Sequence, residues 1–536
     1  MADDISVLTK SIEATDHFIE NVIEFLKKDS DPLENYECIC YELAHSKAAL
    51  EIAKSLTELD LSNEKNLLLA CGFAADAVWQ ISSYFITYDH FHTELIKLLQ
   101  TSQDLISKFK DPAFVYLLKD YQFDSALEPE FQLVADTFRK FGESQIKPYA
   151  EQVHRQNLDV PEEVINKLSE LGGFGLSIPE KYGGFAIEGS NEYLSMVIAT
   201  EELSKASLAI GGSLITRPEI LARALLTGGT ESQKSYWLPK IASGELMVAV
   251  AVTEPDYGSD VANLTTTATR LENGWVINGV KTWCTFGARA DILMLLARSD
   301  PDKDKAHKGL SLFIVPKDRA NGKGFLLTQS SDTPGRPLSL EPGKMEGRPI
   351  DTIGYRGMHS YEIAFENWWV PHENLVGEDS GVNKGFYLQM KGFENGRLQT
   401  AARALGVMQA AYQSGLSYAN SRNVFGKPII NYQLVGQKLG RMNLLINASR
   451  YFTYKVAKMM SQGLGSMEAS LVKAYVCKAA EWVTREAMQI HGGMGYAEEF
   501  PVSRYFVDAR VLSIFEGADE TLSIKVIAKN LLSALN

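Results

Sequence analysis

The sequence predicts a mainly α-helical protein with a small β-domain in the middle of the chain. Apolar residues recur at helical spacings in the first and last parts, whereas short strand-like runs bounded by turn signals gather in between. A chain of 536 residues is also too long for a single hydrophobic core. We therefore expect a helical N-terminal extension at 1–125, a helical domain at 126–245, a β-barrel-like domain at 246–386 and a four-helix bundle at 387–536.

The charge balance is acidic, with 53 Lys and Arg against 67 Asp and Glu and a formal net charge of -14. This balance disfavours nucleic acid or an anionic membrane surface as the main partner. No uninterrupted apolar run reaches the roughly 20 residues of a membrane span. The start, Met1-Ala2-Asp3-Asp4, follows neither the plan of a signal peptide nor that of a transit peptide. We expect a cytoplasmic protein with no membrane span and no nucleic-acid partner.

Familiar metal and nucleotide motifs are missing from the sequence. The five cysteines form no CxxC pair, and Cys38 and Cys40 have no further Cys or His at a common ligand spacing. We interpret the cysteines as buried apolar thiols and expect no metal site. There is also no GxxxxGK(S/T), no HExxH and no GxGxxG after a strand. A dinucleotide, if one is bound, is held by something other than a Rossmann fold.

Helical periodicity covers the first 245 residues. In the extension, apolar residues fall at helical spacings over Phe18–Leu26 and over Ala49–Leu56. In the following domain, Pro161 marks a helix start and Gly172-Gly173 marks its end. After a turn-rich loop, a further helix is predicted from Leu194 to Ser204.

The strands of the β-domain are predicted from short apolar runs at 246–252, 292–297, 310–315 and 361–365. Asn273-Gly274 and Asn278-Gly279 predict two hairpin turns that flank a short strand, Trp275–Ile277. A long polar segment rich in Gly and Pro, 328–348, interrupts the domain. Its length is compatible with a lid or with a solvated loop.

The last part of the chain is predicted to be helical from about residue 387. Long segments that are apolar on one face run through 398–418, 434–460 and 468–490, and a last helix begins at about Thr521. Helices of this length predict a four-helix bundle.

One carboxylate near the C-terminus has surroundings that suit a catalytic base. Glu516 lies between Phe515 and Gly517, after an apolar run that includes Leu512 and Ile514. A carboxylate among apolar groups loses hydration, so its pKa rises and it becomes a better base near neutral pH. The alternative is an ordinary helix N-terminus, where acidic residues favour the positive end of the helix dipole.

The order of these parts resembles the acyl-CoA dehydrogenase flavoproteins, over about residues 126–536. Several separated segments are similar to flavin-contacting segments of that family: Val252-Thr253-Glu254-Pro255 with Gly258-Ser259-Asp260, Trp283-Cys284-Thr285, Ser421–Pro428 and Gln489–Tyr496. The departures are Ala518 and Leu522, where many members have Thr and Gln, and Val250, where an aromatic residue is common. The extension is absent from ordinary members.

The resemblance implies FAD as cofactor. The residues that match its contacts are Val252, Thr253, Gly258, Ser259, Trp283, Thr285, Arg422, Phe425, Gln433, Gln489, Gly492 and Gly493. Each also has a plainer interpretation. Gly258-Ser259 fits a polar turn, Trp283 a position in the β-domain core, and Arg422 the C-terminal end of a surface helix. The glycine pair fits the end of a helix.

The resemblance also implies that Glu516 takes the α-proton of an acyl-CoA while hydride leaves the β-carbon. A subgroup of the family has its base in the first bundle helix, but that position is Gly396 here. The implied substrate contacts are Ser259, Glu394, Arg397, Gly517 and Arg217. Electrons would pass to an electron-transferring flavoprotein, and the expected assembly is a homodimer or a dimer of dimers. An acyl-CoA oxidase, which passes electrons to oxygen, and a dehydrogenase of other chain specificity are the alternatives.

Within the family, the extension together with Gly354–Ser360 and Gly396–Arg403 resembles one branch, whose members act in the ethylmalonyl-CoA pathway. This implies oxidation of methylsuccinyl-CoA to mesaconyl-CoA. The free carboxylate of such a substrate needs a partner, because an unpaired charge in a dry pocket is costly. Arg217 is a candidate, and its alternative interpretation is a surface residue. His359, a hydroxyl or a backbone N–H are the other candidates.

Overall fold

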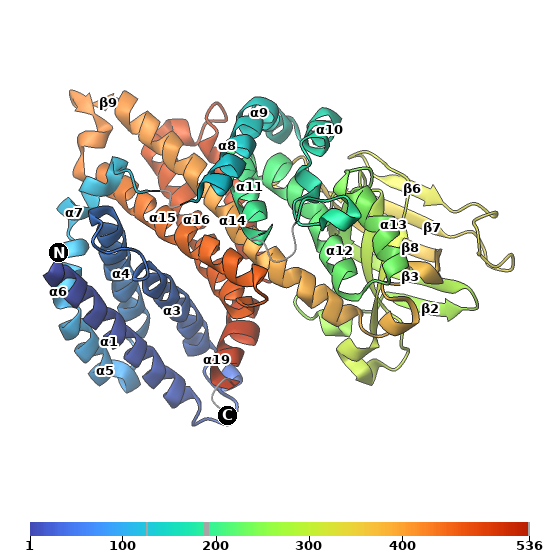
Figure 1. The fold of residues 1–536 in the computed structure, drawn as a ribbon, viewed down its shortest axis with the longest axis horizontal. Coiled ribbons are helices and arrows are strands. Elements are labelled where there is room, and N and C mark those ends of the chain that lie inside the picture. The colour runs from blue at the N-terminus through green and yellow to red at the C-terminus, as the bar shows by residue number, and fades with distance from the viewer. Residues whose placement is uncertain (125–126, 187–191, 534–536) are drawn as a thin grey trace. The chain divides into compact units, whose positions relative to one another are not determined.

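The structure is a computed structural model that describes residues 1–124, 127–186 and 192–533 (Figure 1). It divides into two compact units. The first combines Met1–Asp136 with Thr400–Asn536, and the second is Thr137–Gln399. The predicted fold class, mainly α with a β-domain in the middle of the chain, is confirmed.

The N-terminal extension is a set of amphipathic helices around an aromatic core. Phe18 packs edge to face against Phe85, with ring centroids 5.3 Å apart, and Phe91 joins both rings. Cys38 is exposed, so the prediction that all cysteines are buried is wrong at this position, which lies on the solvent side of its helix. The helices are α1 (Ala2–Leu26), α2 (Pro32–Asn35), α3 (Glu37–Leu56), α4 (Glu64–Phe85), α5 (His92–Thr101), α6 (Gln103–Phe109) and α7 (Pro112–Leu117).

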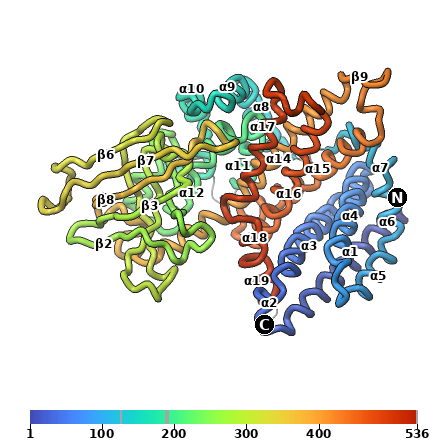
Figure 2. The backbone as a smooth tube through the Cα atoms, turned by 180° about the vertical axis from the view of Figure 1, so that it is seen from behind, coloured from blue at the N-terminus to red at the C-terminus, as the bar shows by residue number. Residues whose placement is uncertain are grey.

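The C-terminal bundle shares the first unit with the extension. Helix α3 contacts α16 and the π-helical segment Leu522–Ala528, while α4 and α7 contact α15 (Figures 1 and 2). The helix expected from about Thr521 is not regular, because a short turn and the π-helical segment precede its last turns. The bundle elements are α14 (Gly385–Ser421, in this unit from Thr400), α15 (Gln433–Ser461), α16 (Ser466–His491), α17 (Val502–Arg510), α18 (Asp519–Thr521) and α19 (Lys529–Ser533).

A buried carboxylate joins the extension to the bundle. Asp76 of α4 is 4% exposed and lies 3.0 Å from the Arg441 guanidinium of α15 and 2.5 Å from Lys110 Nζ. Burial alone would raise the pKa of Asp76, but the two cations outweigh it and lower the pKa below 3.8. The carboxylate is therefore an anion held between two cations.

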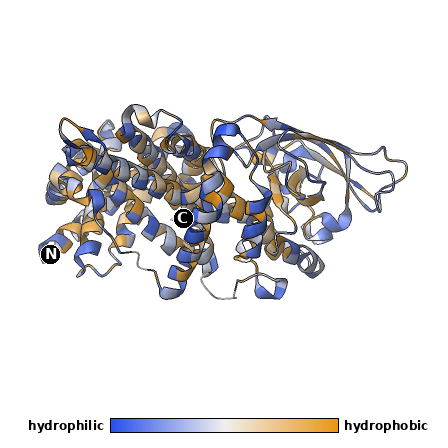
Figure 3. Ribbon diagram, turned by 90° about the horizontal axis from the view of Figure 1, so that it is seen from above, coloured by the Kyte–Doolittle hydropathy of each residue, from blue (hydrophilic) through white to orange (hydrophobic). Residues whose placement is uncertain are grey.

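The second unit combines helices with one mixed sheet. The helices are α9 (Lys147–Gln156), α10 (Glu162–Glu170), α11 (Glu192–Ala206), α12 (Leu214–Gly228) and α13 (Glu231–Ala242); α8 (Pro129–Phe141) spans the division between the units. Helices α12 and α13 bury Leu221, Leu225 and Trp237 in one core with Val248 and Ile292 of the sheet. Figure 3 shows apolar and polar residues sharing the helices, as expected when one face is buried.

The sheet has the strand order β1-β4-β2-β3-β8-β7-β6, with β5 paired to β4. Strands β1 and β4 are parallel, whereas β3 and β8 form a long antiparallel pair. The strands are β1 (Val248–Ala251), β2 (Thr267–Leu271), β3 (Gly274–Thr285), β4 (Ile292–Arg298), β5 (Leu310–Pro316), β6 (Phe325–Thr328), β7 (Lys344–Ile350) and β8 (Ser360–Pro371).

Two local predictions in the β-domain are resolved by strand pairing. Asn278-Gly279 is not the predicted turn, because β3 runs through it, with an irregularity in its pairing with β8 between Ile277 and Gly279. Pairing with β8 continues on both sides, so it overrides the local turn signal. The polar segment 328–348 connects β6 to β7, which pair antiparallel, and its last residues belong to β7. It is therefore the connection of a hairpin.

Candidate active site

The loop that carries Glu516 has an unusual backbone. It lies between the short turn Val511–Ser513 and α18, and both Glu516 and Gly517 have positive φ, at +53° and +98°. Gly517 adopts this region without steric penalty, but Glu516 does so at some cost in energy. Such strain persists only where surrounding contacts fix the chain, so the contacts of this loop identify it as a candidate functional element.

A buried arginine and a threonine hold the Glu516 carboxylate. Arg403 Nη2 lies 2.8 Å from Glu516 Oε1, and the Thr400 hydroxyl donates to Oε2 at 2.9 Å. Both residues are 0% exposed, and the guanidinium also lies over the Phe515 ring at 4.8 Å. The carboxylate therefore lies beside a cation and a hydroxyl, and not among apolar groups alone as the sequence suggested.

The sequence interpretation assigned no contact with Glu516 to Arg403 or Thr400. Their spacing of three on α14 brings both onto one helix face, where Arg403 Nη2 also donates to the Thr400 hydroxyl at 2.8 Å. The one available signal was an arginine inside an otherwise apolar helical stretch, and it does not say which acid is its partner. Lys473 of α16 was also missed. It is 1% exposed and its ammonium donates to the Gly517 carbonyl at 2.5 Å.

In the second unit, the segment Val252–Thr253 follows β1 and is fixed by a buried ion pair. Lys281 Nζ donates to the Val252 carbonyl at 3.0 Å and to Glu254 Oε1 at 2.8 Å, and the Thr282 amide donates to the Thr253 carbonyl at 2.8 Å. Burial raises the pKa of Glu254, but Lys281 and Thr265 outweigh it and lower the pKa to about 2. Burial lowers the pKa of Lys281 to about 8.

Near the end of β3, Trp283 lies within a second irregularity in the pairing with β8, and Thr285 lies just beyond it. Trp283 has φ of +55° and its side chain is 55% exposed, so its interpretation as a core residue is wrong. The irregular backbone turns this ring outward from the sheet. The Thr285 hydroxyl lies 3.0 Å from that of Ser360. Gly258 and Ser259 lie in an exposed turn between β1 and β2.

The Arg422 segment forms an exposed hairpin at the end of α14. Strands β9 (Asn423–Val424) and β10 (Lys427–Pro428) pair across Phe425 and Gly426, both at positive φ. The Phe425 ring is 93% exposed. The Arg422 amide donates to the Tyr418 carbonyl, so this residue does end the helix, while its side chain lies on the surface.

The glycine pair lies close to that hairpin within the first unit. Gly492 caps α16 with φ of +58°, and a side chain at Gly492 or Gly493 would meet no atom within 4 Å. His491 stacks on Tyr418, with ring centroids 4.4 Å apart, and so connects the ends of α14 and α16. Gln489 is exposed one turn earlier. The structure thus brings the Arg422 and Gln489–Gly493 segments together.

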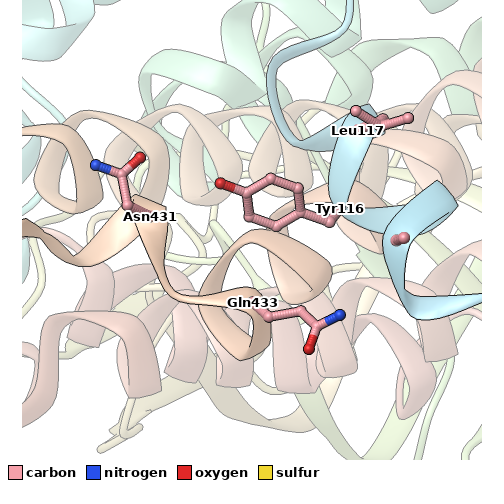
Figure 4. Close-up of a pocket in the computed structure, with 5 residues that line it drawn as sticks. Tyr116, Leu117, Asn431 and Gln433 are labelled. Carbon is pink, nitrogen blue, oxygen red and sulfur yellow. The ribbon is translucent and has the colours of Figure 1, made fainter.

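Gln433 begins α15 and lines a shallow pocket (Figure 4). The other lining residues are Asn431, from the segment before α15, and Ala113, Tyr116 and Leu117 of α7. One wall of this pocket therefore comes from the N-terminal extension.

The remaining substrate candidates all lie in the second unit. Arg217 of α12 is 5% exposed, so the alternative of a surface residue is wrong. Arg397 lies on α14, and burial lowers its pKa while Glu394 opposes that shift. The two ring nitrogens of His359 lie 2.7 Å from Asp159 Oδ1 and 3.1 Å from Asn157 Oδ1. His359 therefore has partners within the chain.

Comparison with known proteins gives the class of enzyme. The family models for the N-terminal, middle and C-terminal domains of acyl-CoA dehydrogenase match residues 128–245, 249–368 and 383–532. The chain therefore belongs to the acyl-CoA dehydrogenase family and is an FAD-dependent acyl-CoA dehydrogenase.

One relative and two solved structures are similar to this chain in sequence and fold. The chain is 41% identical to the (2S)-methylsuccinyl-CoA dehydrogenase of Cereibacter sphaeroides over 409 residues, which cover 76% of this chain and 70% of the relative. Butyryl-CoA dehydrogenase of Megasphaera elsdenii matches with TM-score 0.67 and 30% identity, over 76% of this chain and 100% of that one. A structure described as the electron-transferring flavoprotein of Acidaminococcus fermentans matches with TM-score 0.67 and 29% identity, over 77% and 100%.

The residues present fit FAD. The exposed Trp283 ring offers a flat apolar surface for a planar heterocycle, and Arg422 offers a planar donor fork for a diphosphate. The open space around Gly492 and Gly493 admits a ligand close to the backbone.

None of the helices in the described ranges is long and apolar enough to cross a membrane.

Proposed function

We propose that this enzyme oxidises (2S)-methylsuccinyl-CoA to mesaconyl-CoA, with Glu516 as the base. The contacts of Glu516 carry the chemical part of this proposal, because a base must be ionised and fixed in place. Arg403 and Thr400 contact both carboxylate oxygens and restrict their position. The substrate part is supported by the 41% identity to a methylsuccinyl-CoA dehydrogenase.

Glu516 and Gly517 of the loop have different roles at the α-carbon of the substrate. The Glu516 carboxylate takes the α-proton, and the Glu516 backbone N–H donates to the thioester carbonyl, which gains negative charge as the proton leaves. A donor aimed at developing charge in a site without water stabilises the transition state. Gly517 allows the substrate to come close to the loop backbone, and Lys473 fixes the Gly517 carbonyl by donating a hydrogen bond to it.

FAD supplies the acceptor for the hydride that leaves the β-carbon. On this proposal Val252, Thr253, Trp283 and Thr285 hold the flavin ring. Arg422, Phe425 and Gln433 contact the diphosphate and adenosine part. The same part is contacted by Gly258, Ser259, Gln489, Gly492 and Gly493. Ser259, Glu394 and Arg397 then contact the CoA part of the substrate.

Arg217 is our candidate partner for the free carboxylate of methylsuccinyl-CoA. Its guanidinium is buried, as required of a cation that pairs with a carboxylate away from water. His359 is the other candidate, and its ring nitrogens lie near Asp159 and Asn157.

We further propose that an electron-transferring flavoprotein accepts the electrons and that the enzyme assembles as two or four copies. We place the enzyme in the cytoplasm and its reaction in the ethylmalonyl-CoA pathway. The acceptor is supported by the similarity to a structure described as an electron-transferring flavoprotein. The assembly is supported by the resemblance of Ser421–Pro428 to the family segment that reaches the flavin of a neighbouring subunit.

Anaerobic bleaching of the FAD-loaded enzyme tests the function. Methylsuccinyl-CoA, butyryl-CoA and glutaryl-CoA are added in parallel to the wild type and to Glu516→Gln. We expect methylsuccinyl-CoA to bleach the flavin fastest and the variant not to respond. Bleaching mainly by butyryl-CoA would exclude the proposed substrate, and a reactive variant would exclude Glu516 as the base. Rapid reoxidation by air would indicate an oxidase.

The variant Arg217→Met tests the carboxylate contact. We expect it to reduce turnover of methylsuccinyl-CoA by about 100-fold, because losing a charged partner in a buried site costs about 3 kcal/mol. Turnover of butyryl-CoA, which has no free carboxylate, is the matched control and should change little. Equal losses with both substrates would remove Arg217 from the acyl pocket.

A further inference from the structure

The N-terminal extension contacts the chain immediately after Glu516. Helix α3 lies along the π-helical segment Leu522–Ala528 and along α16, and Figure 2 shows it beside α18. All of these elements belong to the first compact unit. A part of the chain outside the matched family domains therefore lies against the C-terminal side of the catalytic loop.

The contact is a buried polar junction centred on Asp519. The Tyr41 hydroxyl donates to Asp519 Oδ2 at 2.5 Å, and His45 Nε2 lies 3.3 Å from Oδ1. Tyr41 and His45 are one turn apart on α3, so a single helix contacts both carboxylate oxygens. Asp519 and His45 are 4% and 5% exposed. Lys478 Nζ of α16 lies 3.9 Å from Oδ2, and the Ser523 hydroxyl lies 3.4 Å from His45 Nε2.

The charges of the junction agree with this geometry. Burial raises the pKa of Asp519, but the contacts with His45 and Tyr41 outweigh it and hold the pKa below 3.8. Burial and the hydrogen bond to Asp519 both raise the pKa of Tyr41. Asp519 is thus an anion at neutral pH and Tyr41 is its neutral donor.

Asp519 is three residues from the catalytic carboxylate and is the first residue of α18. Only Gly517 and Ala518 separate it from Glu516, and the Gly517 carbonyl is held by Lys473. On the other side, Arg403 and Thr400 hold the Glu516 side chain. The strained loop is therefore fixed at three successive points, and the third of them is supplied by the extension.

We propose that the N-terminal extension takes part in catalysis, with Tyr41 and His45 as positioning residues that fix Glu516 through Asp519. The inference rests on the proposed role of Glu516 as the base. Releasing Asp519 frees α18 and the loop before it, so the carboxylate samples positions away from the α-proton. Misplacement by about 1 Å costs as much as 100-fold in rate, even when binding is intact.

The test compares two Tyr→Phe variants of the full-length, FAD-loaded enzyme. Tyr41→Phe removes the donor to Asp519. Tyr88→Phe is the matched control, because the Tyr88 hydroxyl bonds Glu42, a carboxylate of the same extension next to Tyr41 in sequence. The readouts are the anaerobic flavin reduction rate with methylsuccinyl-CoA and butyryl-CoA, acyl-CoA affinity by flavin spectral titration, and amide hydrogen exchange of peptides that cover 511–522.

We expect Tyr41→Phe to slow flavin reduction about 10-fold with acyl-CoA affinity within about twofold of wild type. Exchange in 511–522 should become faster in the same variant. Tyr88→Phe should match the wild type in all three readouts, and His45→Gln should resemble Tyr41→Phe.

Three results separate the possible failures. If Tyr41→Phe and His45→Gln reduce flavin at the wild-type rate while Glu516→Gln is inactive, the inference is wrong and the proposed function stands. If Tyr88→Phe is as slow as Tyr41→Phe, the effect is one of general stability and the inference is also overturned. If Glu516→Gln reduces flavin normally, the proposed base is wrong and the inference falls with it.

Discussion

Glu516 is held by two buried side chains on a backbone that its residue type disfavours. Its φ of +53° raises the conformational free energy of a residue with a Cβ, and the Arg403 and Thr400 contacts offset that increase. The same contacts remove most rotational freedom from the carboxylate. Stability and chemical competence therefore depend on the same few atoms.

Arg403→Gln tests this dependence. Loss of a hydrogen bond between charged groups costs about 1.5–3 kcal/mol, so we expect flavin reduction to slow by roughly 10- to 100-fold. Arg403→Lys, which keeps the charge but not the planar fork, should recover part of the rate. Stopped-flow reduction at equal FAD content is the measurement. An Arg403→Gln enzyme with the wild-type rate would exclude a role for this pair in the reaction.

Gly517→Ala separates the effect of backbone strain from that of lost contacts. A Cβ at Gly517 would meet no atom within 4 Å, so the penalty comes from its φ of +98°, and we expect about 1 kcal/mol. Gly463→Ala, between α15 and α16, is a matched control with φ of +77° and equally open surroundings. Thermal denaturation should show similar losses for both. Only Gly517→Ala should slow flavin reduction, and a similar slowing in both would contradict a special role for this loop.

At the scale of elements, the end of β1 depends on β3. The Glu254–Lys281 pair is 3% and 0% exposed at its side chains, and Lys281 also holds the Val252 carbonyl. Breaking one half of such a pair leaves a buried charge, whereas replacing both halves is far milder. The strand end proposed to contact the flavin is therefore supported by a charge network and not by apolar packing alone.

Glu254 should give the enzyme a specific acid sensitivity. Its folded pKa of about 2 is below the ordinary 4.5, so its stabilisation is fully present above about pH 4.5 and is lost as the pH falls towards 2. We expect the melting temperature of the wild type to fall through this window and that of Glu254→Gln to fall less steeply. At pH 7 the variant should bind FAD more weakly. Parallel pH slopes in the two proteins would argue against this assignment.

At the scale of the molecule, the extension and the bundle form one compact unit although more than 260 residues separate them in sequence. The Asp76–Arg441 pair is one charged link between them, and the Asp519 junction is another. We expect helices α1–α7 to unfold together with α15 and α16 and not as a separate domain.

Asp76→Asn should weaken that whole unit. Loss of two charged hydrogen bonds, each with a partner that regains water, is expected to lower its unfolding free energy by about 2 kcal/mol. Hydrogen exchange should then become faster in both the extension and the bundle, while β3 and β8 of the other unit keep their protection. Faster exchange confined to α4 would show that the extension opens independently.

Local sequence signals were enough to predict the helical and β parts, most strand positions and Glu516 as a candidate base. Periodicity, turn residues and a distinctive local segment are all local signals, readable without knowing which segments meet. Asn278-Gly279 shows their limit, because the long pairing of β3 with β8 overrode a strong turn signal.

The groups that surround Glu516 and its loop are known only from the packing of the folded chain. Arg403 is 113 residues from Glu516, and Tyr41 is 478 residues from Asp519. The sequence around Arg403 and Tyr41 does not show which acid either residue contacts. A buried charge or hydroxyl must find a partner wherever the packed core brings one, and that choice is made by the packing of α3, α14 and α16 around the loop.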